Sequence, residues 1–143
     1  MGCSVTAPVF TVPAMYERFN TMRLDDAPEV LAPDGAAVRP LAVLEGAASF
    51  AEFALDPGQV TQAVYHATVE EIWFVTAGGG EIWRSQGGRE EVTPLRPGVC
   101  LTVPLGTTFQ FRGGDDGLKV VAATVPPWPV DSPNEATPTK GRW

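Results

Sequence analysis

Two stretches decide the fold of this chain: Gly58-Gln-Val-Thr-Gln-Ala-Val-Tyr-His66-Ala-Thr-Val-Glu-Glu71-Ile-Trp-Phe-Val-Thr-Ala-Gly78 and Gly98-Val-Cys-Leu-Thr-Val-Pro104-Leu-Gly106-Thr-Thr-Phe109-Gln-Phe-Arg112. In both, short runs rich in β-branched and aromatic residues are bounded by glycine or proline. This pattern is typical of β-strands separated by tight turns. The two stretches therefore predict at least four short strands and no helix.

The same pattern extends over the centre of the chain. Apolar runs are separated by breaks such as Asp56-Pro57-Gly58, Gly78-Gly79-Gly80 and Gly113-Gly114-Asp115-Asp116-Gly117, which we expect to be turns. Short strands at this spacing predict an all-β sandwich or barrel. The expected strands cover residues 41–44, 49–55, 60–66, 71–76, 80–84, 90–93, 99–103, 108–112 and 118–125.

The two ends differ from the centre. Residues 1–14 are small and polar with two prolines, which predicts a loose N-terminal arm. Residues 126–143 contain five prolines, too many for a helix or a central strand. We expect this tail to lie extended over a single domain of residues 15–125, with Trp128 and Trp143 as anchors, because an exposed tryptophan leaves a large apolar surface in water.

Composition narrows the function classes. The 143 residues include 17 acidic and 10 basic side chains, a net charge of −7. This balance argues against nucleic-acid and anionic-membrane partners, which require basic surfaces, and no apolar run approaches the roughly 18 residues of a membrane span. The two cysteines form no disulfide framework, and the N-terminus carries no signal pattern, so we expect a cytoplasmic protein. Cys100 lies in an apolar run and is expected to be a buried, inert thiol.

The one histidine of the chain, His66, is the candidate for imidazole chemistry. Glu71 follows five positions later, after a turn-like segment. Alone, a histidine beside a carboxylate is more often a hydrogen-bonded structural residue than a catalyst. Alternation along 60–66 places Gln62 and Val64 on the same face as His66. The spacing of the glycines around this segment favours a functional role for His66 over a purely structural one.

That spacing resembles the two sequence motifs of the cupin family. The first motif is Gly, five residues, His, one residue, His, three or four residues, Glu, six residues, Gly; the second is Gly, five residues, Pro, one residue, Gly, two residues, His, three residues, Asn. The resemblance spans residues 41–125 and implies a single-domain jelly-roll β-barrel, commonly a homodimer. The matching positions are Gly58, His66, Glu71, Gly78, Gly98, Pro104 and Gly106.

The departures from the motifs bear on the metal that cupins typically bind. Val64 and Phe109 stand at two of the three histidine positions, so His66 and Glu71 alone remain of four ligands. Catalytic metal sites generally keep three protein ligands. We therefore expect no cofactor and no tightly bound metal. The alternative is a weakly held divalent ion (Fe, Ni, Zn or Mn) on His66 and Glu71.

Without a metal, the resemblance implies an apolar, aromatic-lined pocket inside the barrel that binds a small molecule. The alternative is that the same side chains fill a solid core. Gln110 and Arg112, which alternate with the phenylalanines, are expected to face water. The expected substrate-binding residues are Gln62, Val64, Trp73, Val75, Trp83, Phe109 and Phe111.

In such a pocket His66 and Glu71 predict acid–base catalysis. Glu71 would orient one ring nitrogen and leave the other for the substrate. The chemistry available is isomerisation, dehydration or cyclisation of a small, polyketide-like organic molecule, as in an isomerase, lyase or cyclase of secondary metabolism. Two other classes stay open: a metal-dependent oxygenase or hydrolase with a degenerate site, and a non-catalytic protein that binds a small ligand.

Overall fold

The structure is a computed structural model that describes residues 19–129, 132 and 134–143. Within these residues a single 3-10 turn, η1 (Leu24–Asp26), precedes the strands, and all other regular structure is β. The expected N-terminal arm, 1–14, lies outside the described residues. The strands are β1 (Val30–Leu31), β2 (Ala37–Leu44), β3 (Ala48–Leu55), β4 (Val64–His66), β5 (Glu70–Gln86), β6 (Arg89–Leu95), β7 (Cys100–Val103), β8 (Thr108–Val125) and β9 (Ala136–Pro138).

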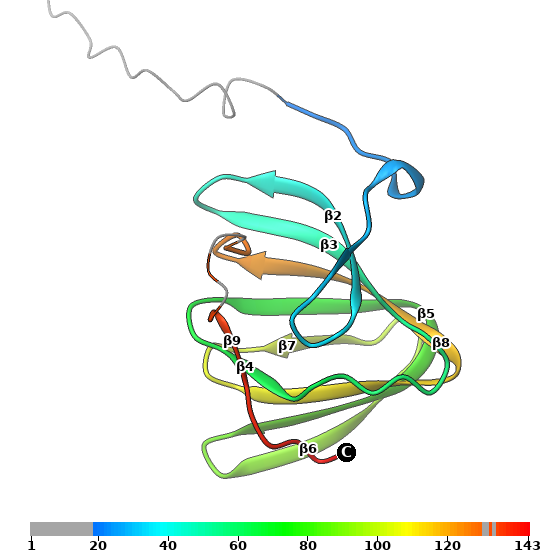
Figure 1. Ribbon diagram of the computed structural model, residues 1–143, viewed down its shortest axis with the longest axis vertical. Coiled ribbons are helices and arrows are strands. Elements are labelled where there is room, and N and C mark those ends of the chain that lie inside the picture. The colour runs from blue at the N-terminus through cyan, green and yellow to red at the C-terminus, as the bar shows by residue number, and fades with distance from the viewer. Residues whose placement is uncertain (1–18, 130–131, 133) are drawn as a thin grey trace, which may run out of the picture.

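The strands form one strongly curled antiparallel sheet, which agrees with the all-β prediction (Figure 1). The order is β1-β2-β3-β8-β4-β9, and β5 pairs with β6, β7 and β8. The two longest strands, β5 and β8, pair with each other over both of their halves. One half of β8 also pairs with β3 and the other half with β4, so this pair of strands joins the two halves of the barrel.

Two glycine clusters, 78–80 and 113–117, lie opposite each other where β5 and β8 bend. A Cβ on Gly78 would collide with the carbonyl oxygen of Gly117, and one on Gly80 with the carbonyl oxygen of Arg112. Glycine allows the two backbones to approach this closely and to shift register without losing the ladder. The prediction of turns at both clusters is therefore wrong: four expected strands form two continuous, bent ones.

The inner face of the curled sheet is filled by aromatic and branched side chains. Trp73 lies at its centre and contacts the rings of Phe53, Phe109 and Phe111, with centroid distances of 5.9, 5.9 and 4.8 Å. Val75 is also fully buried. Perpendicular and tilted ring pairs of this kind add to the free energy gained from apolar burial. These contacts fix the neighbourhood of the candidate site.

The C-terminal tail runs beside β4 and covers polar backbone that would otherwise be a sheet edge (Figure 1). The side chain of Gln110 accepts hydrogen bonds from the backbone N–H groups of Arg142 and Trp143, and it donates to the carbonyls of Thr61 and Trp143. Gln110 is buried, so the prediction that it faces water is wrong, because the tail replaces the water. Arg112 lies 4.1 Å from the ring centroid of Trp143.

Two other sequence predictions, for Cys100 and for the strand at 60–66, differ from the structure. Cys100 is exposed rather than buried, because it alternates with the inward-facing Leu101 along β7. The expected strand 60–66 is regular only in β4, with an isolated bridge between Val60 and Arg112 before it. Among the described residues, no helix has the length and apolarity needed to cross a membrane.

The close approach at the bend predicts unequal costs for two similar substitutions. Gly78 and Gly58 have nearly the same backbone angle, φ +70° and +73°, but Gly58 has open space around its Cβ position. Gly58→Ala should cost only the left-handed strain, roughly 1–2 kcal/mol. Gly78→Ala should cost about 2 kcal/mol more, because its methyl group meets backbone. Urea unfolding at pH 7 measures both, and equal costs would contradict the bend described here.

Candidate active site

The centre of the site is the imidazole of His66, which is held between two buried carboxylates. Nδ1 lies 2.8 Å from Oε2 of Glu135, and Nε2 lies 2.6 Å from Oε1 of Glu71. All three residues are at most 4% exposed. Only the contact of Nδ1 with Glu135 also has the angles of a hydrogen bond; Nε2 makes a close charge contact whose direction is not that of its ring N–H.

Glu135 is the residue that sequence reasoning missed. It precedes β9 in the proline-rich tail, 69 positions from His66. Its second oxygen, Oε1, accepts hydrogen bonds from the backbone N–H groups of Thr68 and Val69 and from the hydroxyl of Thr68. Its sequence neighbours give little indication of this role, because a lone glutamate in a proline-rich tail is expected to be exposed to water. The turn 67–69 thus holds the carboxylate, and the carboxylate holds the ring.

Glu71 is held from the other side. It faces the interior from β5, and its Oε2 accepts a hydrogen bond of 3.0 Å from the indole N–H of Trp73. This bond leaves Oε1 to face His66. The expectation that Glu71 orients one ring nitrogen while the other is left for the substrate needs correction, since Glu135 takes Nδ1. Orientation of the ring belongs to Glu135, and Glu71 faces the nitrogen at the opposite side.

Two aromatic rings enclose the imidazole. Phe109 lies 5.3 Å from it between centroids, and Trp128 meets it edge-on, also at 5.3 Å. Trp128 also packs against the core, which agrees with the anchoring expected for the tail. The ring of His66 is therefore shielded from water on both of these sides, while its nitrogens contact charge.

Electrostatics favour the charged ring. Burial lowers the pKa of His66, but the close carboxylates of Glu71 and then of Glu135 raise it by more, so the net direction is above 6.5. A third carboxyl belongs to the same field: burial raises the pKa of Asp34 from 3.8 to about 6, against the opposing hydrogen bond from Ala36, and the charge of Glu71 adds to the rise. The net effect at His66 favours the imidazolium, and the raised pKa of Asp34 favours its neutral carboxyl form below about pH 6.

The structure brings together most, not all, of the predicted lining residues. Gln62 is exposed and donates to the carbonyls of Ala63 and Thr139; its expected inward direction is wrong because 60–63 is not regular strand. Trp83 pairs with Gln110, on the sheet face away from the interior, so its expected place is also wrong. The residues that do share the interior with His66 are Val64, Trp73, Val75, Phe109 and Phe111.

These interior side chains pack against one another. Two of the pockets on the described surface lie beside the β5–β6 hairpin and beside the bend at Gly117–Lys119. Neither is lined by His66, Glu71 or any of the predicted lining residues. The interior thus has the aromatic character predicted, with the side chains in contact across it.

The donor set does not fit the metal that the fold family implies. Of the four ligand positions of the motifs, only His66 and Glu71 carry a metal-binding side chain, whereas catalytic sites generally keep three protein ligands. Nδ1 is engaged by Glu135, and hydrocarbon side chains, Val64 and Phe109, occupy the other two positions. Within the described part of the chain, no three His, Cys, Asp or Glu residues are grouped to hold an ion.

Comparison with known proteins supports the fold. No protein-family model matches the chain, and no curated protein matches its sequence. Among solved structures, Pac13 from Streptomyces, described as a nucleoside dehydratase, has a TM-score of 0.66 at 13% identity and covers 86% of this chain and 92% of its own. A variant of PAC13 with uridine has a TM-score of 0.67 at 14% identity.

Two further solved structures share the architecture. KdgF from Halomonas sp. has a TM-score of 0.64 at 19% identity over 75% of this chain and 94% of its own. Oxalate decarboxylase from Bacillus subtilis has a TM-score of 0.68 at 15% identity over 83% of this chain, but this chain spans only 32% of that enzyme. All of these proteins have cupin folds, and the chain has the cupin jelly-roll fold as well.

The raised pKa of His66 predicts a pH-dependent stability. Because the folded protein binds this proton more tightly than the unfolded chain, the stabilisation is complete below pH 6.5 and is lost as the pH rises through the folded-state pKa. Urea unfolding should show the advantage of the wild type over His66→Gln shrinking above pH 6.5, by up to about 1.4 kcal/mol per pH unit. An advantage that grows with pH would contradict an imidazolium.

The raised pKa of Asp34 predicts a second pH range in which the stability of the protein changes. Because burial raises the pKa of Asp34 from 3.8 to about 6, the folded protein holds this proton more tightly than the unfolded chain does. The free energy of unfolding therefore falls as the pH rises between those two values. Asp34→Asn should remove this loss between pH 4 and 6 and keep the dependence above pH 6.5. If the Asn variant unfolds with the same pH profile as the wild type throughout, Asp34 is not part of the field around His66.

Proposed function

We propose that this protein catalyses metal-independent acid–base chemistry on a small organic molecule, with dehydration as the reaction that its site supports best. Isomerisation and cyclisation use the same proton transfers. The observation that carries the proposal is the imidazole of His66 held between Glu71 and Glu135. It pairs a proton donor and a proton acceptor within one buried site, which is the arrangement that an elimination requires.

In a dehydration, Glu71 is the base and His66 the acid. The carboxylate of Glu71 takes the proton from the carbon next to the substrate's carbonyl group. The electron pair of that C–H bond forms the C=C bond, and the C–O bond to the leaving hydroxyl breaks. The hydroxyl takes the Nε2 proton of His66 and leaves as water, so the substrate loses one proton and one hydroxide in total.

After one turnover, proton transfer from Glu71 to His66 restores the starting state of the site. After the reaction Glu71 carries the proton and His66 is neutral. Oε1 and Nε2 are 2.6 Å apart, so the proton returns from the carboxyl to the ring once the two groups rotate into line. Glu135 stays in contact with Nδ1 and keeps the ring in place throughout. Its role is that of a positioning residue.

The structural neighbours support a small-molecule enzyme. The match to Pac13, the nucleoside dehydratase, spans nearly the full length of that protein, and variants of Pac13 are described with uridine. At 13–14% identity this likeness does not assign a substrate. It does make a hydroxylated, sugar-containing molecule a reasonable member of a substrate panel. A homodimer and a cytoplasmic location remain parts of the proposal.

One observation favours a second candidate, a non-catalytic protein that binds a small ligand. His66 is only 4% exposed, and Phe109 and Trp128 contact it on two sides. A catalytic ring must reach its substrate, so the enzyme needs a movement of one of these side chains that a binding protein does not need. The two candidates differ in turnover.

Proton exchange tests the proposal directly. The full chain is incubated in D2O with a panel of small β-hydroxy aldehydes and ketones, including sugar-containing members and members with a carboxylate or phosphate group, and NMR follows the proton next to the carbonyl and the appearance of unsaturated product. Glu71→Gln and His66→Gln should each lower the rate at least about 100-fold, because general acid–base groups contribute this much. EDTA should leave the wild-type rate unchanged.

Glu70→Gln is the matched control. Glu70 is the neighbouring, exposed carboxylate, and its hydrogen bond from the Leu105 N–H can be kept by the amide oxygen of glutamine. Its rate should equal that of the wild type. No exchange with any member of the panel would overturn catalysis in favour of the binding protein, and loss of the rate with EDTA would overturn metal independence.

A further inference from the structure

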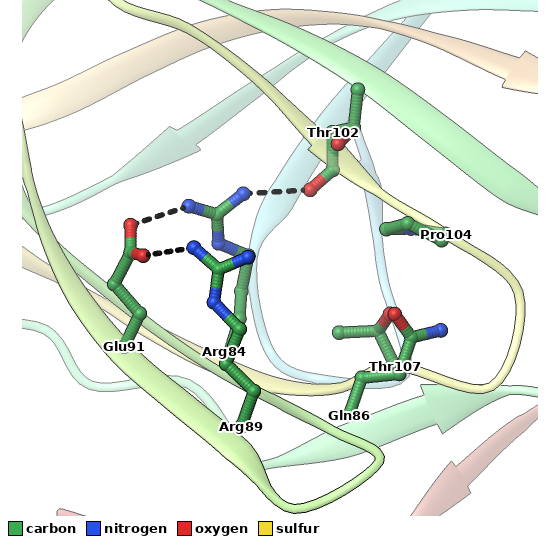
Figure 2. Close-up of a pocket in the computed structure, with 7 residues that line it drawn as sticks. All are labelled: Arg84, Gln86, Arg89, Glu91, Thr102, Pro104 and Thr107. Carbon is green, nitrogen blue, oxygen red and sulfur yellow. Dashed lines mark hydrogen bonds and ion pairs between the residues drawn. The ribbon is translucent and has the colours of Figure 1, made fainter.

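A polar pocket lies between the β5–β6 hairpin and the turn at Pro104–Gly106 (Figure 2). Its volume is about 150 Å³, enough for a small charged group with a few neighbouring atoms. Of its side chains, only Pro104 belongs to a motif of the sequence, and the charged ones do not. The pocket is lined by Arg84, Gln86, Arg89, Glu91, Thr102, Pro104 and Thr107.

The pocket carries an excess of positive charge. Arg84 and Arg89 both bind Glu91, at 3.3 and 2.9 Å, so two guanidinium groups share one carboxylate (Figure 2). The pKa of Glu91 is lowered by its hydrogen bonds from Thr93 and Arg89, which keeps it ionised. The local sum is therefore one positive charge in a protein whose net charge is −7.

Both arginines keep hydrogen-bond donors free. Arg84 is fixed by bonds to the carbonyl of Thr102, to Glu91 and to the hydroxyl of Thr93. A guanidinium has five N–H donors, so these three bonds leave two. Arg89 is bound only through Glu91 among the described residues and is 82% exposed. One cation is thus rigid and the other is able to close over a ligand.

Thr107 provides an independent observation. It is 2% exposed, and its hydroxyl has no hydrogen-bond partner among residues 19–129, 132 and 134–143. A buried polar group without a partner destabilises a folded protein, so each such group calls for an explanation. A ligand oxygen in the pocket that Thr107 lines would supply the missing partner.

The pocket is on the same face of the sheet as His66. Val64 pairs with Phe109 and Tyr65 with Thr108, so continuing this register brings His66 level with Thr107. Residues that are level on neighbouring strands and share a face have Cβ atoms about 5 Å apart. Arg84 pairs with Phe109 and faces the same side. Thr107 therefore lies between the pocket and the position of His66 on this face of the sheet.

We propose that this pocket binds the oxyanion group, a carboxylate or a phosphate, of an acidic small molecule, through Arg84, Arg89 and the hydroxyl of Thr107. Arginine matches both oxyanions because its planar fork donates to two oxygens at once. The identification of the acidic molecule as the substrate rests on the proposed function of His66. Anion binding itself does not.

Calorimetric titration of the full chain, at constant ionic strength, tests the site with inorganic phosphate and with malonate as separate probes. Binding of phosphate alone indicates a phosphate ester as the natural ligand, and binding of malonate alone indicates a carboxylic acid. Arg89→Gln should weaken the better probe about tenfold or more, the loss expected for one charge-assisted contact. Binding of neither probe would overturn the proposal.

Arg23→Gln is the matched control for Arg89→Gln. Arg23 has a similarly exposed side chain, 78%, and an acidic partner two positions later, Asp25, but it lies outside the pocket. It should bind the probe as the wild type does. If both variants weaken binding equally, the effect is one of overall charge, and the pocket is not an anion site.

Thr107→Val separates ligand binding from a structural role. Valine has the same shape without the hydroxyl, so the variant should unfold at the same or a higher urea concentration and bind the probe several-fold more weakly. A destabilised variant with unchanged binding would overturn the role of Thr107. His66→Gln should keep anion binding, because His66 does not line the pocket. If the wild type binds the probe but exchanges no proton with any member of the panel, the catalytic proposal alone is disproved and the anion site stands.

Discussion

The contact on which the rest of this structure depends is the one between the imidazole of His66 and its two carboxylates. Burying a charge is costly unless it is paired and hydrogen-bonded. Here the pairing is extensive: Glu135 accepts from the backbone of Thr68 and Val69, and Glu71 accepts from the indole of Trp73. The consecutive strands β4 and β5 and the C-terminal tail, which carries Glu135 69 positions after His66, therefore meet at one ring. Removing any partner leaves a buried charge without compensation.

The location of this site follows from the strong local signals of the chain. The glycine, proline and glutamate spacings of the two motif-like stretches predicted the barrel, and they singled out His66 and Glu71, which the structure places 2.6 Å apart. Alternation correctly placed Val64, Trp73, Val75, Phe109 and Phe111 inside, because β4, β5 and β8 are regular there. It failed for Gln62, where the strand has not begun, and for Trp83, which alternates with the inward-facing Ile82.

What the sequence could not predict comes from long-range contacts. Nothing near Glu135 indicates that a tail with five prolines returns to the imidazole, and Gln110 is buried only because the same tail pairs with it. The glycine clusters at 78–80 and 113–117 are equally turn-like in isolation; they bend two strands rather than end them because each faces the other. The cationic pocket beside Thr107 escaped notice because Arg84, Arg89 and Glu91 lie in a hairpin that carries no motif.

Because the chain has one histidine, NMR of the protein labelled with 15N-histidine reports on the central claim without ambiguity. The account predicts that the ring of His66 titrates above pH 6.5, and that Glu135→Gln shifts this titration downward, because one of the two carboxylates that raise its pKa is gone. A titration below pH 6.5, or one that Glu135→Gln leaves in place, would contradict it.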